Sequence, residues 1–220
     1  LAGNTQPRCV AKSIVIQPRE TRMIDVFCVY ASKAMSSGVG MTVDYDVPRE
    51  LEQEFYDPRR NKSDTQQIIW QGVTNIAGER GSPGVSRDNL KGNLDIDRKA
   101  SQPFLSKIPE IPDQIGMAVF VGSGIYGLQI FDSPDSWRER RNALIEKELS
   151  GLNRAADGSA SGEGLKPDEI SSLLREFISQ DFETEEVERG AEWQTLAVDA
   201  GSHSGEATIL NDRVIHFSIG

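Results

Sequence analysis

The sequence predicts an α+β fold: a single domain over residues 1–220 with a largely antiparallel or mixed sheet and helices packed on it. Hairpin patterns recur along the chain, because apolar β-prone runs are separated by short turn-forming segments. Helical segments lie between them without the regular alternation of strand and crossover helix that marks α/β folds. The chain has 220 residues, 37% of them hydrophobic, which is enough to bury a core without disulfides or metals.

The first part of the chain is expected to hold a strand pair and a short helix. Lys12 to Ile16 and Arg22 to Tyr30 are rich in β-branched and apolar residues. Gln17 to Glu20 lies between them and contains a turn-forming proline. Residues 46–55 begin with an Asp and an early Pro, which is typical of a helix start.

Two further helices are expected before the middle of the chain. From Ser63, which can cap a helix, apolar residues recur at helical spacing until Gly81, so one face should be buried. Residues 81–96 are rich in Gly, Ser, Asp and Asn and are expected to form a loop with at most one helical turn. A short helix from Arg98 to Lys107 should follow.

The clearest strand pair lies in the middle of the chain. Gly116 to Val121 and Ile125 to Phe131 are apolar and β-prone, and the short Gly-Ser-Gly segment between them predicts a tight hairpin. Gly122, Gly124 and Gly127 also spell G-x-G-x-x-G, a pattern of dinucleotide sites. Since no helix signal begins at the third glycine, a hairpin turn is the preferred interpretation.

The C-terminal part is expected to hold two helices and three strands. Ser133 and Pro134 provide an N-cap and a proline in the first helical position, and their helix should end at Gly151. A flexible loop is expected near residues 154–164, which are rich in Gly, Ser and Ala. Pro167 to Ile178 carries an apolar stripe that needs a surface to pack against. One strand is expected over Glu192 to Val198. Glu206 to Leu210 and Val214 to Ile219 should form a hairpin around the turn residues Asn211, Asp212 and Arg213.

Charge and composition exclude several classes of protein. The net charge is −10, and residues 151–220 hold 5 basic and 14 acidic side chains. Such a surface repels phosphate backbones, so general nucleic-acid binding is not expected. No apolar run is long enough to span a membrane. Two cysteines and two histidines are too few for a disulfide framework or a typical structural zinc site, and a reducing, cytoplasmic location fits best. Other cofactors are left open.

A few residues are candidates for chemistry. His216 lies between two apolar neighbours in the last expected strand and needs a hydrogen-bond partner if it points inward. Cys28 is a nucleophile only where a base or a helix N-terminus lies nearby, and otherwise packs as a thiol. Gln67 and Trp70 share a helix face, where they offer an amide contact and a stacking wall; alternatively Trp70 packs and Gln67 is exposed. No familiar local catalytic signature is present, so any active site is assembled from distant positions.

Several segments, taken together, resemble one family. They are VFCVY at Val26 to Tyr30, QIIW at Gln67 to Trp70, the stretch from Gln114 to Trp137, and RVIHFSIG at Arg213 to Gly220. In this order, over almost the whole chain, they resemble the ARG and rhodanese-phosphatase-superfamily-associated protein domain, an uncharacterised family. The resemblance implies an association with ADP-ribosylglycohydrolases and phosphatases, and so with NAD or ADP-ribose metabolism or with conflict systems that use it.

Residue by residue, the resemblance implies an altered site. Cys28 matches the cysteine strand of the family, but Tyr30 stands where a glutamate is usual, and Gln129 replaces a commoner acidic residue. The loss of two carboxylates removes candidate acid and base groups. His216 falls on the terminal strand of the family and is the cleanest match among titratable residues.

Three functions follow as alternatives, and whether the chain is an enzyme is left open, as is its oligomeric state. The preferred one is a ligand-binding or accessory domain for a nucleotide-like molecule or a protein partner. In this function Trp70 is the stacking surface for the ligand, and the polar contacts come from Gln67, Gln129 and His216. The second is a hydrolase or transferase acting on a phosphoester, N-glycosidic or ADP-ribosyl bond, with His216 or Asp132 as base and Cys28 close by. The third is a protein-interaction subunit whose acidic C-terminal part docks a basic partner. The first two require these side chains to meet at one pocket.

Overall fold

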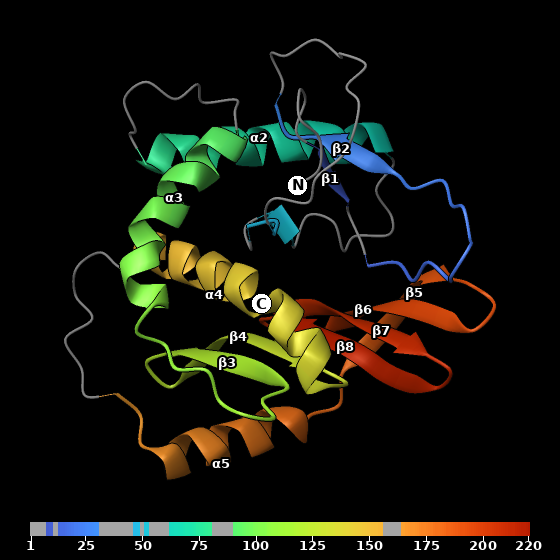
Figure 1. The fold of residues 1–220 in the computed structure, drawn as a ribbon. Coiled ribbons are helices and arrows are strands. Elements are labelled where there is room, and N and C mark those ends of the chain that lie inside the picture. Colours follow the sequence, from blue (N-terminus) through green and yellow to red (C-terminus); the bar gives the residue numbers. More distant parts are fainter. Residues whose placement is uncertain are drawn as a thin grey trace. The chain divides into compact units, whose positions relative to one another are not determined.

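The computed structural model is an α+β fold whose strands pair antiparallel, as the sequence predicts (Figure 1). It describes residues 8–10, 13–30, 46–48, 51–52, 62–80, 90–155 and 164–220. The chain groups into two compact units, residues 1–111 with 140–155 and residues 112–139 with 156–220. The predicted single domain stays a prediction, and most of the loop expected near 154–164 lies outside the described residues.

A short strand pair in the first unit differs from the predicted one. β1 (Arg8–Val10) pairs antiparallel with β2 (Val26–Cys28), and Cys9 lies opposite Phe27. The strand predicted over Lys12 to Ile16 is wrong for its described residues 13–16, which are not in a strand. Cys9 and Phe27 are buried, whereas no side chain in residues 13–16 is buried. The strands therefore pair where their side chains reach the core.

Two helices of the first unit follow the predicted order. α2 (Lys62–Arg80) confirms the helix predicted from Ser63, with Ile69, Val73 and Ile76 buried on one face. α3 (Leu90–Leu105) begins eight residues before the predicted start at Arg98. Leu90 and Leu94 lie one helical turn apart and are both buried, so their packing outweighs the polar composition of this segment.

Half of the short helix predicted over residues 46–55 falls outside the described part of the chain. Leu51 and Glu52 are helical, residues 46–48 are not, and residues 53–55 are not described. Leu51 is fully buried and belongs to the core of the first unit. The other buried members of this core are Cys9, Phe27, Val29, Ile69, Val73, Ile76, Leu90 and Leu94.

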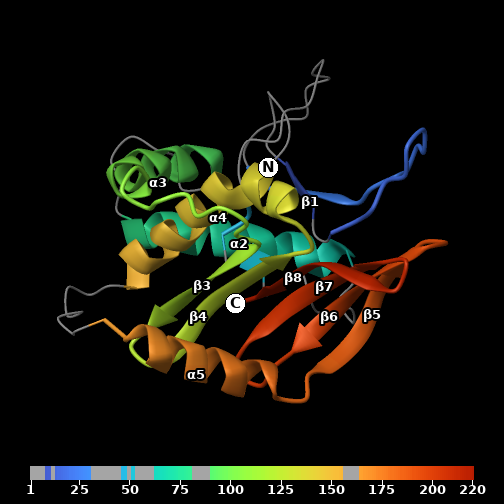
Figure 2. The same cartoon turned by 60° about the horizontal axis from the view of Figure 1, so that its bottom comes forward.

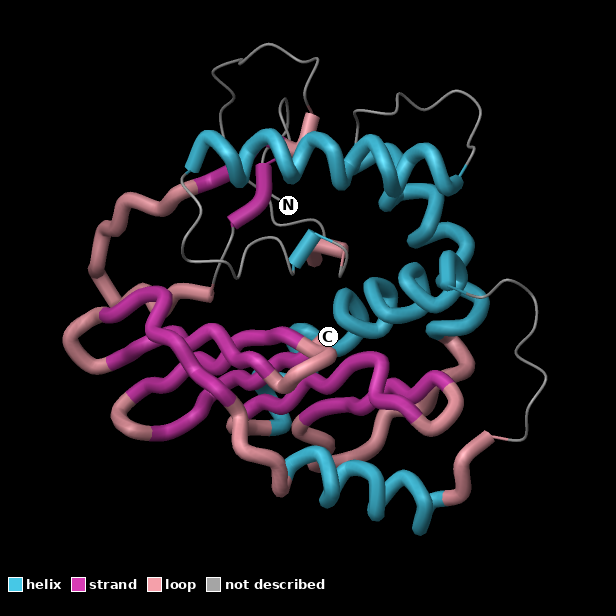
Figure 3. Tube along the Cα trace, turned by 180° about the vertical axis from the view of Figure 1, so that it is seen from behind, coloured by secondary structure: helices cyan, strands magenta, loops and turns pink. Residues whose placement is uncertain are grey.

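The second unit is built on an antiparallel sheet, whose strands are magenta in Figure 3. Its six strands lie in the order β3-β4-β8-β7-β6-β5. The predicted hairpin β3–β4, strand β6 and hairpin β7–β8 are confirmed. The edge strand β5 was not predicted. Four of its seven residues are glutamate, and charged residues disfavour strands while protecting sheet edges. The bounds are β3 (Gly116–Val121), β4 (Gly124–Phe131), β5 (Glu183–Arg189), β6 (Trp193–Asp199), β7 (Ser204–Leu210) and β8 (Arg213–Ile219).

Tight turns join the central hairpins of this sheet. Gly122 has a φ of 60°, which glycine adopts without strain, and Gly124 and Gly127 lie within β4. The glycine pattern is therefore a hairpin turn, as predicted, and not the start of a helix. Asn211 and Asp212 have φ angles of 49° and 58°, as expected for the two central residues of a type I′ turn between β7 and β8.

Two helices lie between β4 and β5 in the sequence. α4 (Pro134–Ala155) starts at the predicted cap, where the Ser136 amide donates to Ser133 Oγ over 3.2 Å, and it continues past Gly151. α5 (Pro167–Ile178) confirms the predicted amphipathic helix and lies along the sheet (Figure 2). Its Phe177 and Leu174 pack with apolar side chains of the sheet. These include Leu128, Val198, Ala207, Phe217 and Ile219.

Candidate functional site

The face of this sheet opposite the α5 core is polar. Because directly paired residues of neighbouring strands point to the same face, the register of β6, β7, β8 and β4 defines two cross-strand rows. The intervening residues, which point the other way, form the apolar core under α5. We call these two rows the polar face. They are Ala197, Glu206, Ser218 and Gln129, and Thr195, Thr208, His216 and Phe131.

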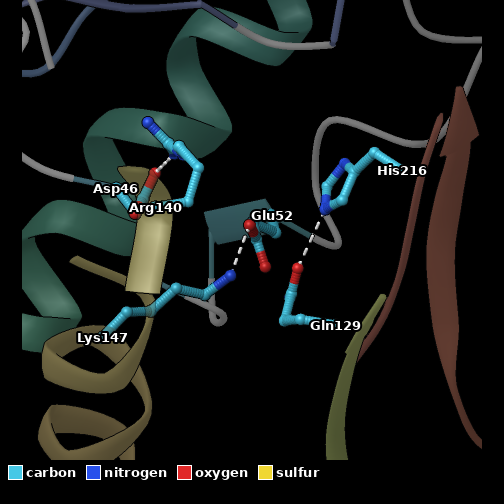
Figure 4. Close-up of polar contacts among 6 residues, drawn as sticks. All are labelled: Asp46, Glu52, Gln129, Arg140, Lys147 and His216. Carbon is cyan, nitrogen blue, oxygen red and sulfur yellow. Dashed lines mark hydrogen bonds and ion pairs between the residues drawn. The ribbon is translucent and has the colours of Figure 1, made fainter. Parts of the chain in front are cut away.

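His216 and Gln129 meet on the polar face, as their candidate roles require. His216 Nε2 donates to Gln129 Oε1 over 3.0 Å (Figure 4). The Phe131 ring stacks on the His216 ring, with centroids 4.5 Å apart and an angle of 26° between the planes. A hydrogen bond from β4 and a stacked ring from the same strand therefore fix the orientation of the imidazole.

The polar face buries groups that a purely structural sheet would leave apolar. Glu206 and Thr208 are each 3% exposed. Among the residues that the structure describes, Thr208 Oγ1 has no hydrogen-bond partner, and neither has the indole Nε1 of Trp137. The Trp137 ring lies 6.0 Å from that of Phe131, so this second unpaired group borders the same face. An unpaired buried donor costs about 1 to 3 kcal/mol, which a ligand or an ordered water would recover.

The polar face places the carboxyl group of Glu206 and the imidazole of His216 on the neighbouring strands β7 and β8. Thr208 is paired with His216 and Glu206 with Ser218, so Glu206 and His216 are diagonal neighbours, typically about 7 to 8 Å apart between Cα atoms. A carboxylate and an imidazole at this spacing suit ligand recognition and proton transfer alike. In the described part of the chain, no three His, Cys, Asp or Glu side chains are grouped to hold a metal ion.

The other three candidate residues lie in the first unit. Cys28 is half-buried at the end of β2. Its amide donates to Gln66 Oε1 over 2.9 Å, and its carbonyl accepts from Gln66 Nε2 over 2.8 Å. Gln67 is exposed on α2, and Trp70 is 37% exposed one turn further along. The side chain that hydrogen-bonds to β2 is therefore that of Gln66. The sequence had indicated the next residue, Gln67, as the candidate.

The second cysteine is a packed thiol. Cys9 is 1% exposed, and its Sγ donates to the Phe27 carbonyl over 3.8 Å. Burial raises the pKa of the Cys9 thiol from 9.0 to about 12, because the thiolate would lose its hydration. Cys9 therefore stays protonated at neutral pH and is no nucleophile.

Ion pairs hold the C-terminal part of α4 within the first unit. Arg140 pairs with Asp46, and Lys147 pairs with Glu52 over 2.6 Å (Figure 4). Arg98 binds Glu146 over 3.0 Å. The cavity between these groups measures about 30 Å³, which holds about one water molecule. Most of these charges are paired, but the buried Asp46 Oδ2 has no hydrogen-bond partner among the residues that the structure describes.

Sequence reasoning missed Glu206, Thr208 and Trp137. The signal for the first two was present, because polar and apolar residues alternate through β7. Placing β7 opposite β8 through the predicted turn would have put Glu206 and Thr208 beside Ser218 and His216. Trp137 had no such signal, since its place beside Phe131 depends on the tertiary contact.

These observations define an α+β protein with a buried polar sheet face. The family model of the ARG and Rhodanese-Phosphatase-superfamily-associated Protein domain matches residues 1–219. The chain therefore belongs to this family, as the sequence motifs predicted. Neither a curated protein nor a solved structure matches it. No helix in the described ranges is both long and apolar enough to cross a membrane.

Proposed function

We propose that the protein binds a small nucleotide-like molecule on the polar face of its six-stranded sheet. The observation that carries the proposal is the buried Thr208 hydroxyl, which has no partner among the described residues and lies beside the oriented His216. Buried polar groups are normally hydrogen-bonded in folded proteins. An oriented imidazole beside an unpaired hydroxyl is the kind of arrangement that a ligand completes.

The family resemblance suggests which ligands to try first. Its implied link to NAD or ADP-ribose metabolism makes these two molecules the starting probes. Both cysteines are free thiols, which supports the further proposal that the protein works in a reducing compartment such as the cytoplasm.

Titration calorimetry of the whole chain with NAD and ADP-ribose tests the proposal. We expect heat of binding for at least one of them, and at least a tenfold weaker affinity for His216→Ala because it removes a polar contact. Trp70→Ala is the matched variant for the predicted stacking role on α2. A loss in Trp70→Ala with full binding in His216→Ala would move the site to α2. No heat for any nucleotide-like probe would remove the small-ligand function.

A hydrolase or transferase is the second candidate, and the buried Glu206 diagonal to His216 favours it. In this function His216 acts as a base on a phosphoester, N-glycosidic or ADP-ribosyl bond, and Glu206 replaces the carboxylates that the resemblance finds missing. Once a substrate is found, His216→Ala should abolish turnover. The turnover rate of Cys28→Ser tests whether the Cys28 thiol takes part in the reaction. An unchanged rate in a folded His216→Ala protein would exclude this role.

A further inference from the structure

β3 is an edge strand without charge. Among the residues that the structure describes, it pairs with β4 and with no other strand, at the end of the sheet opposite β5 (Figure 1). Residues 114–131, which include β3 and β4, contain no charged side chain and no proline. An apolar edge of this kind is a template for pairing with another strand, and proteins commonly block such edges with charges or prolines.

The pairing with β4 fixes which backbone groups of β3 point away from the sheet. The Phe131 amide donates to the Ile115 carbonyl over 2.8 Å. Since hydrogen-bonded pairs alternate along an antiparallel ladder, Met117 and Val119 are the next residues of β3 that bond to β4. The residues between them turn their amide and carbonyl groups to the outer edge.

These outward residues are Gly116 and Ala118. The Gly116 carbonyl accepts a hydrogen bond from Gln114 Nε2 over 2.7 Å, as a carbonyl turned away from β4 can. A bulge between Val119 and Phe120 interrupts the pairing with β4 only near the hairpin turn. The outward donors and acceptors therefore lie in a regular stretch of strand.

A second copy of the chain fits this edge. Two β3 strands can pair antiparallel about a two-fold axis, because each offers the other the same donors and acceptors. The net charge of −10 opposes self-association, but β3 carries none of this charge. At the other edge, four of the seven residues of β5 are glutamate, and like charges directly opposite one another destabilise a strand pair. Self-pairing is therefore favoured at β3 and disfavoured at β5.

We infer that the protein forms a two-fold symmetric dimer in which β3 of one copy pairs with β3 of the other. The two sheets then become one continuous sheet, with the backbone groups of Gly116 and Ala118 bonded across the axis. Ile115 and Val121, at the two ends of this strand, are exposed apolar side chains. Antiparallel pairing brings each of them to the opposite end of the second β3, where it is covered.

Sedimentation velocity of the whole chain tests the dimer. We expect a dimer in the concentrated protein, and Ala118→Pro should weaken it at least tenfold because proline removes an outward amide. The Ala118 amide makes no bond to β4, and edge strands tolerate proline at such positions, so the variant should fold, which thermal unfolding checks. A monomer at every concentration, or a dimer of equal strength in folded Ala118→Pro, would overturn the inference.

The matched control places proline at the other edge of the sheet. The Gly190 amide donates to the Trp193 carbonyl over 2.8 Å, so the backbone groups of Arg189 point outward from β5 by the same alternation. Arg189→Pro should leave the dimer unchanged. Equal weakening by Arg189→Pro and Ala118→Pro would show that the contact is not made by β3 and would overturn the inference.

Hydrogen exchange in the unmodified protein gives a second readout that needs no variant. The amides of Gly116 and Ala118 have no partner in the described part of the chain, yet they should be protected in the concentrated protein because the second β3 binds them. The amides of Met117 and Val119 should be protected by β4 at every concentration. Fast exchange at Ala118 in the concentrated protein would overturn the inference.

Discussion

Thr208 is a residue at which fold and function place opposite demands. Its hydroxyl is buried without a partner in the described structure, so the folded state without ligand carries a desolvated polar group. A valine would fill almost the same volume with no such cost. A residue that lowers stability in this way is best explained by what it binds.

Thr208→Val should therefore stabilise the free protein by about 1 kcal/mol, because it removes an unsatisfied hydroxyl. Urea unfolding of the free protein measures this change. Thr195→Val is the matched control: Thr195 pairs with Thr208 in the sheet register, is also buried, but takes part in a polar interaction. The control should lose stability. Destabilisation of both variants alike would show that the Thr208 hydroxyl is satisfied in the folded protein.

The buried Cys9 thiol makes the free energy of unfolding fall as the pH rises above 9. The folded state holds the pKa of this thiol at about 12, against 9.0 without burial. Below pH 9 the thiol is protonated in both states, and its contribution to stability is complete. As pH rises from 9 towards 12, the unfolded chain loses the proton first, so the free energy of unfolding should fall by up to about 1.4 kcal/mol per pH unit.

The measurement compares urea unfolding at pH 8 and pH 10 in the native protein and in Cys9→Ala. Lysines and tyrosines titrate in both proteins, so the difference between the two slopes isolates the thiol. We expect a steeper loss in the native protein, although Cys9→Ala starts from a lower stability because of the cavity that it leaves. Equal losses in the two proteins would contradict the burial of the Cys9 thiol.

At the scale of single elements, local signals predict the structure where the chain supplies them. Ser133 with Pro134 marked the start of α4, and Asn211 with Asp212 marked the turn between β7 and β8. α3 and β5 were predicted poorly because their local composition opposes the structure they adopt. The packing of Leu90 and Leu94 extends α3, and pairing with β6 holds the glutamate-rich β5 in the sheet.

One side chain amide hydrogen-bonds α2 to the backbone of β2, beside the apolar packing of the two elements. Gln66 makes two hydrogen bonds to the backbone of Cys28, whereas the next residue, Gln67, is exposed. Gln66→Ala should cost about 1 to 3 kcal/mol of stability, because both backbone groups lose their partner, and Gln67→Ala should change little. Hydrogen exchange at the Cys28 amide should accelerate in the first variant alone. Equal protection of this amide in both variants would show that the contact does not hold β2.

At the scale of the whole molecule, long-range pairing assembles the site. β4 and β8 are adjacent in the sheet although Gln129 and His216 are 87 residues apart in sequence. No local pattern specifies which strands become neighbours, so the sequence identified both residues but not their contact. The sequence-based hypothesis also placed Gln129 and His216 in one site with Cys28, Gln67 and Trp70. These three residues belong to the first unit, whereas Gln129 and His216 belong to the second.

The molecule is acidic, and most of its net negative charge lies in the C-terminal part of the chain. The formal net charge is −10, and residues 151–220 hold 14 acidic side chains against 5 basic ones. This field favours the approach of basic partners. The predicted docking of a basic protein partner on this region stays a prediction, and it would show itself as complex formation that weakens with added salt.

Mapping of bound ligand by nuclear magnetic resonance tests the central claim most directly. The ¹⁵N-labelled chain is titrated with NAD and with ADP-ribose, and the amide shifts are followed by residue. We expect the largest shift changes at the amides of Gln129, Thr208 and His216, and we expect them to be lost in His216→Ala. Changes confined to α2 around Trp70, or no changes with either molecule, would contradict it.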